Sequence, residues 1–130
     1  MNNTRKKILL VDDSNTILMT ERMILTKGPY DLITAKDGEE AIAKALAERP
    51  DLILMDVVMP KMNGFDAVRR IRAEEGISDT PIIMVTTRGE VQNVETGFES
   101  GCNDYVTKPI NAAELMAKLR NYLVQGTERS

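Results

Sequence analysis

The sequence contains no histidine and a single cysteine, Cys102, in 130 residues. Without histidine it cannot build a Ser-His-Asp or Cys-His triad, a histidine metal site or a phosphohistidine carrier. One cysteine excludes a disulfide framework and a zinc site of clustered thiolates, and we expect Cys102 to be a small, inert, buried side chain. Carboxylates, hydroxyls and ammonium groups are therefore the side chains left to carry chemistry.

Long hydrophobic runs are also missing, because no stretch approaches the roughly 20 apolar residues that a membrane span requires. The positive segment 1–7 runs into only four apolar residues, which is too short for a signal peptide. The chain is slightly acidic, with 17 Lys and Arg against 20 Asp and Glu, whereas nonspecific nucleic-acid binders are normally basic. We therefore expect a cytoplasmic protein whose partners are neither membranes nor nucleic acids.

The length suits one domain, since single domains commonly run to about 100–150 residues. Structural patterns extend from about residue 7 to residue 123, and residues 124–130 form a short polar tail. We therefore expect one domain over residues 1–130, with no second domain after it.

Short apolar runs at residues 8–11, 52–55 and 82–85 predict three strands. They are too short for buried helices and lack polar alternation, which is typical of parallel strands covered on both faces. The more mixed segments 31–35 and 104–107 are typical of edge strands.

Between these strands, apolar residues recur at a helical period in five segments. These are Ile17, Leu18, Ile24 and Leu25; Ala41, Ile42, Ala45 and Leu46; Phe65, Val68 and Ile71; Val91, Val94 and Phe98; and Leu115, Leu119 and Leu123. Five strands alternating with five helices predict an α/β fold, a doubly wound parallel sheet with helices on both faces. Arg69, Arg70 and Arg72 look like the solvated face of one helix.

Polar side chains follow four of the five predicted strands, at the sheet edge where such folds bind ligands. They are Asp12, Asp13, Asp56, Thr86 and Lys108. Three crowded carboxylates repel one another unless a cation lies among them. Oxygen ligands favour Mg²⁺ first, then Mn²⁺ or Ca²⁺.

The ammonium and the hydroxyl could bind the oxygens of a phosphoryl group. With no histidine, the plausible nucleophile is an aspartate, which forms an acyl phosphate. The first two aspartates could instead cap the following helix, but Ser14 is available for that role.

Four segments together resemble the receiver domain of two-component response regulators. They are residues 10–13, 56–64, 85–87 and 108–109, and the resemblance extends from about residue 7 to residue 123. It implies a flavodoxin-like sheet with strand order 2-1-3-4-5 and a Lys108-Pro109 peptide bond that is typically cis. The chain looks like a stand-alone regulator of the chemotaxis type.

The resemblance also implies roles for the residues of the site. Asp56 would accept a phosphoryl group from a sensor histidine kinase or a histidine phosphotransfer protein. Asp13, Asp56 and the backbone carbonyl of Val58 would hold Mg²⁺, and Asp12 would assist through water. Lys108 and Thr86 would contact the phosphoryl group. The protein would be a switch that catalyses only its own phosphorylation and dephosphorylation.

Tyr105 would be the switch aromatic, responding to Thr86. Its neighbourhood predicts an output face for an unidentified protein partner, which also includes Val91, Gln92 and Glu95. Two positions thought to tune the lifetime of the acyl phosphate carry Val58 and Arg88, neither of which can position an attacking water as an amide or carboxylate could. Thr87, often alanine in the family, could narrow access.

Two other functions fit parts of the pattern. An aspartate-nucleophile phosphatase of the haloacid-dehalogenase type needs a second aspartate two residues after the first, on the first strand, but Val58 follows Asp56 at that spacing. A flavin carrier on the same fold needs a phosphate-binding loop rich in Ser, Thr and Gly where this chain has Asp12 and Asp13. Turnover of phosphate monoesters would support the phosphatase, and visible absorbance the flavin carrier.

Overall fold

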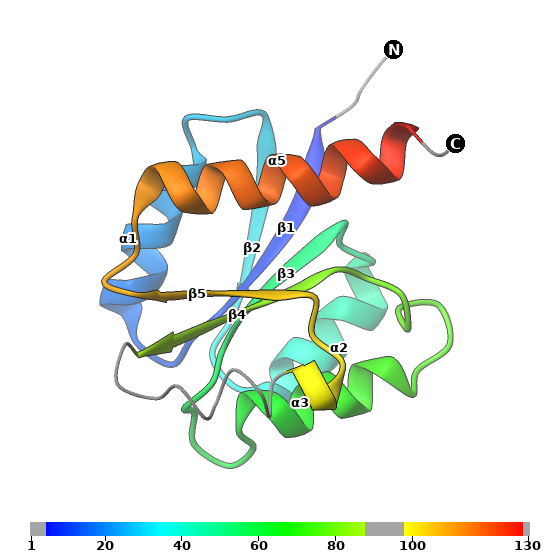
Figure 1. Cartoon of the computed structure of the whole chain (residues 1–130). Helices are drawn as coiled ribbons and strands as arrows, with labels where there is room; N and C mark the ends of the chain where they lie inside the picture. The colour runs from blue at the N-terminus through cyan, green and yellow to red at the C-terminus, as the bar shows by residue number, and fades with distance from the viewer. Residues whose placement is uncertain (1–4, 88–97, 129–130) are drawn as a thin grey trace.

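The structure, a computed structural model, describes residues 5–87 and 98–128, and side chains of the second range as far as Leu123. Five parallel strands form one sheet in the order β2-β1-β3-β4-β5, which confirms the predicted fold class and strand order (Figure 1). The strands are β1 (Lys6–Val11), β2 (Tyr30–Ala35), β3 (Leu52–Asp56), β4 (Ile82–Thr87) and β5 (Asp104–Lys108).

Four helices of the described residues are α1 (Asn15–Leu25), α2 (Gly38–Glu48), α3 (Gly64–Arg72) and α5 (Ala112–Glu128). The segment of Val91 and Val94, where another helix was predicted, lies outside the described residues. The last helix runs to Glu128, so it includes residues 124–128 of the short polar tail expected after residue 123. Polar residues are compatible with a surface helix, and this tail contains no proline to stop one. No helix in the described ranges is long and apolar enough to cross a bilayer.

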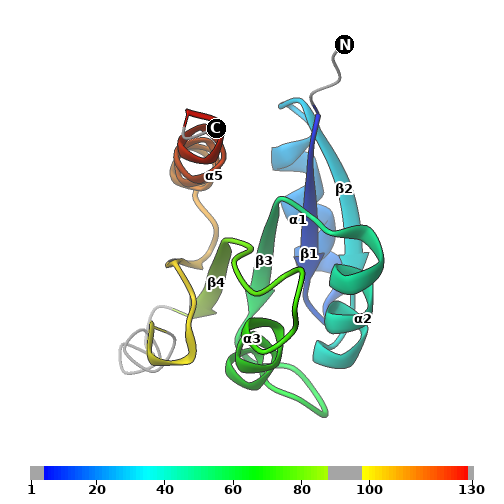
Figure 2. The same ribbon diagram turned by 90° about the vertical axis from the view of Figure 1, so that its right-hand side faces the viewer.

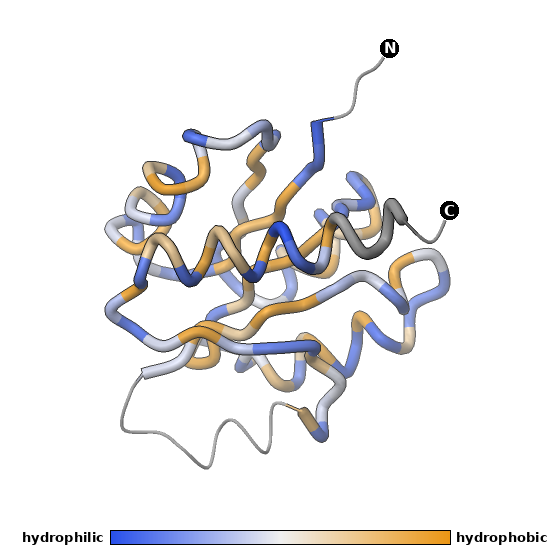
Figure 3. Tube along the Cα trace, turned by 45° about the horizontal axis from the view of Figure 1, so that its top comes forward, coloured by the Kyte–Doolittle hydropathy of each residue, from blue (hydrophilic) through white to orange (hydrophobic). Residues whose placement is uncertain are grey.

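The side chains of the central strands alternate between two apolar layers. In β1, Leu9 and Val11 pack with α2 and α3, whereas Ile8 and Leu10 pack with α1 and α5. Figures 1 and 2 show α5 on one side of the sheet and α3 on the other, and Figure 3 shows hydrophobic strands in the middle of the molecule. Because strands covered on both faces need apolar residues at every position, their sequences read as continuous apolar runs.

Short polar side chains start the helices that follow β1, β2 and β3. The Ser14 hydroxyl accepts a hydrogen bond from the Ile17 N–H at 3.3 Å, and Asp37 and Asn63 cap α2 and α3 in the same way. Ser14 is therefore the cap of α1, and Asp12 and Asp13 remain free of that role.

Arg72 corrects one expectation, because it does not belong to a solvated face. Its guanidinium donates hydrogen bonds of 2.7–2.9 Å to Gly101 O, Ser78 O, Thr80 O and Asn103 Oδ1. Two loops, one before β4 and one before β5, are thus held by one half-buried side chain from α3. The nearby Cys102 is buried as predicted, and burial raises the pKa of its thiol to about 11.

Two residues of the predicted apolar helical faces are more exposed than expected. Leu46 is 37% exposed and Phe98 is 48% exposed. Both belong to apolar patterns at the correct period, but they lie at the margin of the buried stripe, where a helix side chain leaves the core.

Candidate functional site

The carboxyl ends of β1, β3, β4 and β5 surround a polar cleft of about 270 Å³. The five side chains predicted to converge all line it: Asp12, Asp13, Asp56, Thr86 and Lys108. Parallel strands place their carboxyl ends at the same edge of a sheet, so four segments that are distant in sequence meet there.

Three carboxylates line the cleft and lie close to one another. Oxygens of Asp12, Asp13 and Asp56 all lie within 4.8 Å of one another. Asp12 and Asp56 are 1% and 4% exposed, whereas Asp13 is exposed. The Ser14 N–H donates a 2.9 Å hydrogen bond to Asp12 Oδ1, which orients the deeper carboxylate of the pair.

Lys108 provides the positive charge of the cleft. Its Nζ lies 3.1 Å from Asp56 Oδ1 and 3.5 Å from Asp12 Oδ2. Lys108 is the last residue of the edge strand β5, and the Lys108-Pro109 peptide bond that follows is cis, as the resemblance implies. One lysine thus faces two buried carboxylates, and the cleft retains an excess of negative charge.

The pKa values of the side chains in the cleft reflect this excess of negative charge. Burial, and then repulsion from Asp12, raise the pKa of Asp56 to about 6, although Lys108 opposes the shift. Burial also raises the pKa of Asp12. Burial alone would lower the pKa of Lys108, but hydrogen bonding and attraction from the two aspartates outweigh it and raise this pKa. A cation placed among the carboxylates would reverse the shift of Asp56.

Two buried oxygens of the cleft have no hydrogen-bond partner. They are Asp12 Oδ2, which has only the 3.5 Å ionic contact with Lys108, and Thr86 Oγ1. Buried polar atoms without partners are uncommon and point to a missing ligand or water. A hard cation on the carboxylate side and an anion with oxygen acceptors on the hydroxyl side would satisfy both atoms.

The residues present fit a magnesium ion. The three carboxylates supply hard oxygen ligands, and Mg²⁺ commonly binds through one or two carboxylates while keeping several waters. The loop after β3 brings Val58 to the rim, where its side chain is 62% exposed. This loop is anchored by a 2.8 Å hydrogen bond from the Gly64 N–H to Val57 O.

Gly64 is a residue of this site whose role the sequence pattern did not reveal. A Cβ at this position would collide with the backbone carbonyl of Asp56. Only glycine lets α3 begin so close to the end of β3, and the loop that carries Val58 depends on that approach.

Glu21 is a buried carboxyl group that the sequence analysis missed. It lies on α1, is 1% exposed, and its Oε1 has no hydrogen-bond partner. Burial, then repulsion from Asp12 and Asp56, raise its pKa to about 8. Its spacing from Leu18 and Leu25 places it on the buried face of the helix. A single glutamate among the apolar residues of that face was the sequence feature that could have indicated a buried carboxyl group.

The side chains of the predicted switch lie on neighbouring strands. Thr86 is buried in β4, and Tyr105 is half-buried in β5. The Tyr105 ring meets Phe98 edge-on, with ring centroids 6.4 Å apart and an interplanar angle of 88°, and Lys118 Nζ lies 5.5 Å from its centroid. The other residues expected on the output face, Val91, Gln92 and Glu95, lie outside the described residues, as does Arg88.

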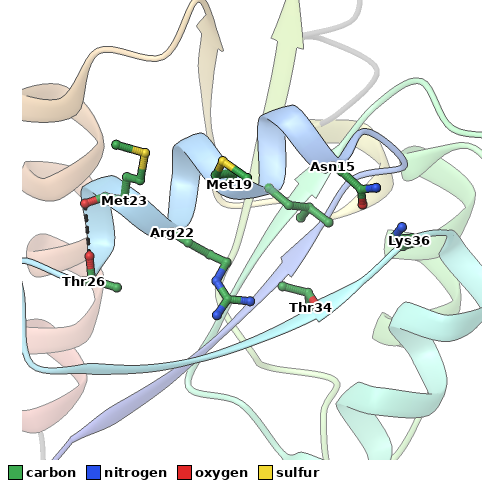
Figure 4. Close-up of a pocket in the computed structure, with 8 residues that line it drawn as sticks. Asn15, Met19, Arg22, Met23, Thr26, Thr34 and Lys36 are labelled. Carbon is green, nitrogen blue, oxygen red and sulfur yellow. Dashed lines mark hydrogen bonds between the residues drawn. The ribbon is translucent and has the colours of Figure 1, made fainter.

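A groove of about 570 Å³ runs along α1 next to the end of β2 (Figure 4). It starts at Asn15, one residue after the cap that follows the acidic pair. Met19 and Met23 are 61% and 66% exposed on this helix. Arg22 and Lys36 also line the groove, and neither side chain has an ion pair among the described residues.

The sequence profile of the response regulator receiver domain matches residues 8–120. The chain belongs to this family. Its relatives include the probable transcriptional regulator ycf27 of Pyropia yezoensis, 44% identical over 123 residues, which are 95% of this chain and 49% of the relative. The alkaline phosphatase synthesis transcriptional regulatory protein PhoP of Bacillus subtilis is 41% identical over 118 residues, covering 91% and 48%. The chain thus spans about half the length of these relatives.

Solved structures agree. The chemotaxis protein CheY4 of Vibrio cholerae is 37% identical, with a TM-score of 0.86 over 92% of this chain and 100% of its own. The receiver domain of the sensor histidine kinase PA1611 from Pseudomonas aeruginosa, solved with a magnesium ion coordinated in its active-site cleft, is 33% identical, with a TM-score of 0.85 over 92% and 98%. Receiver domains are phosphorylation switches that accept phosphoryl groups from sensor histidine kinases and bind Mg²⁺ in an acidic active site.

Proposed function

We propose that this chain is a Mg²⁺-dependent phosphorylation switch in which Asp56 is the phosphoacceptor. One observation carries the assignment: Asp56 alone ends a central strand, with its carboxylate 3.1 Å from Lys108 and within 4.8 Å of both other acids. Asp13 stands at the exposed side of the cleft and Asp12 at its base, which suits them to bind a cation.

The transfer forms one bond and breaks one. An Asp56 carboxylate oxygen attacks the phosphorus of a phosphohistidine that is protonated on its other ring nitrogen. The P–O bond forms and the P–N bond breaks, and the histidine leaves as a neutral imidazole that keeps this proton and the P–N electron pair. Negative charge on the transferred oxygens is stabilised by the Lys108 ammonium and by the Thr86 hydroxyl, which donates a hydrogen bond it has no partner for in the free protein.

Asp13, Asp56 and the Val58 carbonyl would hold the metal, with Asp12 bound through water. The bound Mg²⁺ would neutralise the carboxylates and the incoming phosphoryl oxygens. Mn²⁺, a hard ion with similar ligand preferences, should substitute. We expect Asp13→Ala to abolish metal-dependent phosphorylation and Asp12→Ala to weaken it less or about equally, with a chelator as the control.

A small acyl-phosphate donor tests the assignment without a partner protein. With Mg²⁺, the wild type should be labelled and Asp56→Asn should not. Asp79→Asn, an exposed aspartate in the loop before β4, is the matched control and should be labelled like the wild type. Full labelling of Asp56→Asn would refute the proposal.

The switch is proposed to catalyse only its own phosphorylation and dephosphorylation. The competing phosphatase reading would need turnover of external phosphate monoesters. Val58, rather than an acid, stands two residues after Asp56, and this supports the switch. Absence of monoester turnover by a protein that still becomes phosphorylated would separate the two functions.

The phosphodonor, a sensor histidine kinase or a histidine phosphotransfer protein, is proposed to dock on the α1 groove of Figure 4. The groove begins beside the acidic cleft, and exposed methionines suit adaptable protein contacts. The double variant Met19→Ser, Met23→Ser should slow phosphotransfer from the kinase and leave labelling by a small acyl phosphate unchanged. Leu46→Ser, which removes an exposed apolar side chain from α2, is the control.

The output is proposed to pass through protein contacts near Tyr105. When Thr86 is drawn toward a phosphoryl oxygen, the space beside the Tyr105 ring changes, and the phosphorylated state is favoured only by its differential contacts. A beryllofluoride complex, which mimics the phosphoryl group, should shift amide signals at residues 86–95 and 104–108. Shifts confined to the acidic cleft would show that Tyr105 only packs. The relatives that the chain matches over about half of their length are transcriptional regulators.

A further inference from the structure

A separate cavity of about 420 Å³ lies at the opposite end of the strands from the acidic cleft. Its apolar wall consists of Tyr30, the first residue of β2, together with Met116 and Leu123 on one face of α5. Figure 1 shows α5 crossing the sheet near the starts of β1 and β2. The volume falls within the roughly 300–1,000 Å³ that is usual for small-molecule sites.

Three cations line this cavity. They are Lys6 at the start of β1, Lys27 in the loop after α1, and Arg120 on α5, and no acidic residue is among the lining residues that the structure describes. None of the three side chains has an ion pair or hydrogen bond with another described residue. Three unpaired cations from segments that are distant in sequence therefore line one cavity with an apolar wall.

Neighbouring cations at the same end of the sheet are paired. Arg5 Nε lies 2.8 Å from Asp31 Oδ1, and Lys7 Nζ lies 2.9 Å from Glu48 Oε1. The unpaired state of the lining cations is therefore not a general property of this end of the molecule. Acids are available on β2 and α2, and they meet the cations that face away from the cavity.

The loop that forms the wall is closely packed. A Cβ on Gly28 would lie 2.7 Å from the Tyr30 ring and 3.3 Å from Met116 Cε. The glycine backbone therefore packs directly against the ring and against α5, and these contacts fix this wall of the cavity. A site formed in advance loses less free energy of ordering when a ligand binds.

We propose that this cavity binds a small amphiphilic anion, a molecule with an apolar body and one carboxylate or phosphate group. The apolar body would lie against Tyr30, Met116 and Leu123, and the anionic group would contact the lysines and Arg120. Charge complementarity excludes cationic ligands, and the apolar wall gives a free inorganic anion little to bind. The site is distinct from the phosphorylation cleft and does not depend on the proposed function.

Octanoate is the probe, titrated into the 130-residue protein labelled with ¹⁵N. We expect saturable shifts of the amides of Lys27, Gly28 and Tyr30 and of residues 116–123. 1-Octanol, which keeps the tail without the charge, and acetate, which keeps the charge without the tail, should each bind much more weakly. Equal shifts with all three, or octanoate shifts located elsewhere, would overturn the proposal.

The double variant Lys27→Gln, Arg120→Gln removes two exposed cations from the rim and should weaken octanoate about fivefold, the size expected for two exposed charge contacts. The matched control Arg22→Gln, Lys36→Gln removes two cations from the α1 groove and should not change octanoate binding. Equal weakening by both pairs would mean that octanoate responds to net charge only. Binding to anionic phospholipid vesicles without binding free octanoate would identify a membrane contact and would also overturn the proposal.

Discussion

The ammonium of the half-buried Lys108 lies 3.1 Å from Oδ1 of the buried Asp56. The lysine is the group that limits the pKa of Asp56 to about 6, against burial and the repulsion of its acidic neighbours. The contact with Lys108 therefore favours the ionised form of Asp56, the proposed phosphoacceptor, at neutral pH in the metal-free protein.

Lys108→Met should raise the pKa of Asp56 well above 6 in the metal-free protein, because the hydrogen bond and the attraction that favour the carboxylate are lost. A ¹³C carboxyl titration by NMR measures it. Lys118→Met is the control, since Lys118 Nζ lies 2.8 Å from Asp104 Oδ1, away from the cleft. An unchanged Asp56 titration in Lys108→Met would contradict the assigned role.

Magnesium affinity should fall with pH below about 6, because protons and the metal compete for Asp56. With this pKa the dissociation constant at pH 5.5 should be about fourfold weaker than at pH 7.5 from Asp56 alone. Calorimetric titration of the wild type measures it. The Asp56→Asn protein should bind weakly with a flatter pH dependence, and a wild-type affinity that does not change over this range would be inconsistent with the shift.

Glu21→Met should stabilise the protein. The folded state holds Glu21 with a pKa of about 8, against 4.5 for the ordinary group. Because the folded state binds the proton more tightly, the wild type loses stability as pH rises from 4.5 to 8, by about 3 kcal/mol at pH 7.

Urea unfolding at several pH values tests this expectation. The difference between Glu21→Met and the wild type should be small near pH 4.5 and grow toward pH 8. Glu75→Met, at an exposed glutamate, should show no such trend. A destabilised Glu21→Met at pH 8 would mean that the carboxyl group has a partner.

Arg72→Met should cost about 3 kcal/mol of unfolding free energy, because three backbone carbonyls and one side-chain oxygen lose a charged donor. Denaturant unfolding gives the value. Arg70→Met removes an exposed arginine from the same helix and should change stability little. Similar losses of unfolding free energy in both variants would mean that Arg72 contributes no more than a solvated arginine, as the sequence suggested.

The acyl phosphate should be long-lived, because Val58 has no hydrogen-bonding side chain and an arginine at position 88 donates but cannot accept. Val58→Asn combined with Arg88→Glu supplies groups that can position water and should speed hydrolysis by roughly tenfold or more. Decay of the label after removal of the donor measures it, with each single variant as control. A slower or unchanged decay would refute the explanation.

Sequence patterns predicted the core strands of this fold because the burial of each strand shows in the composition of that strand alone. Residues 8–11, 52–55 and 82–85 are buried on both faces, so each strand shows as an unbroken apolar run. The order of the strands is not contained in those runs, and it was available only through the resemblance to receiver domains. The strands β1 and β2 begin earlier than predicted, at Lys6 and Tyr30. These two residues pair with each other in the sheet.

The site residues could be predicted because all of them lie at or just after the carboxyl ends of strands. The features that were missed depend on contacts between distant parts of the chain. The burial of Glu21 requires the layer formed with α5, and Arg72 takes its role from carbonyls up to 29 residues away. The cavity at the far end depends on Met116 meeting the loop of Gly28. No local pattern carries that information.

The six residues of β1 separate the two ends of the molecule. Lys6 opens this strand beside the cationic cavity, and Asp12 follows its last residue in the acidic cleft. Six residues span roughly 20 Å, and two unit charges at that distance interact by less than about 1 kcal/mol at an effective dielectric constant of about 20. The charge of a molecule bound at one end would therefore have little electrostatic effect on the other end. Coupling between the two sites would require a movement of α5 or of β1.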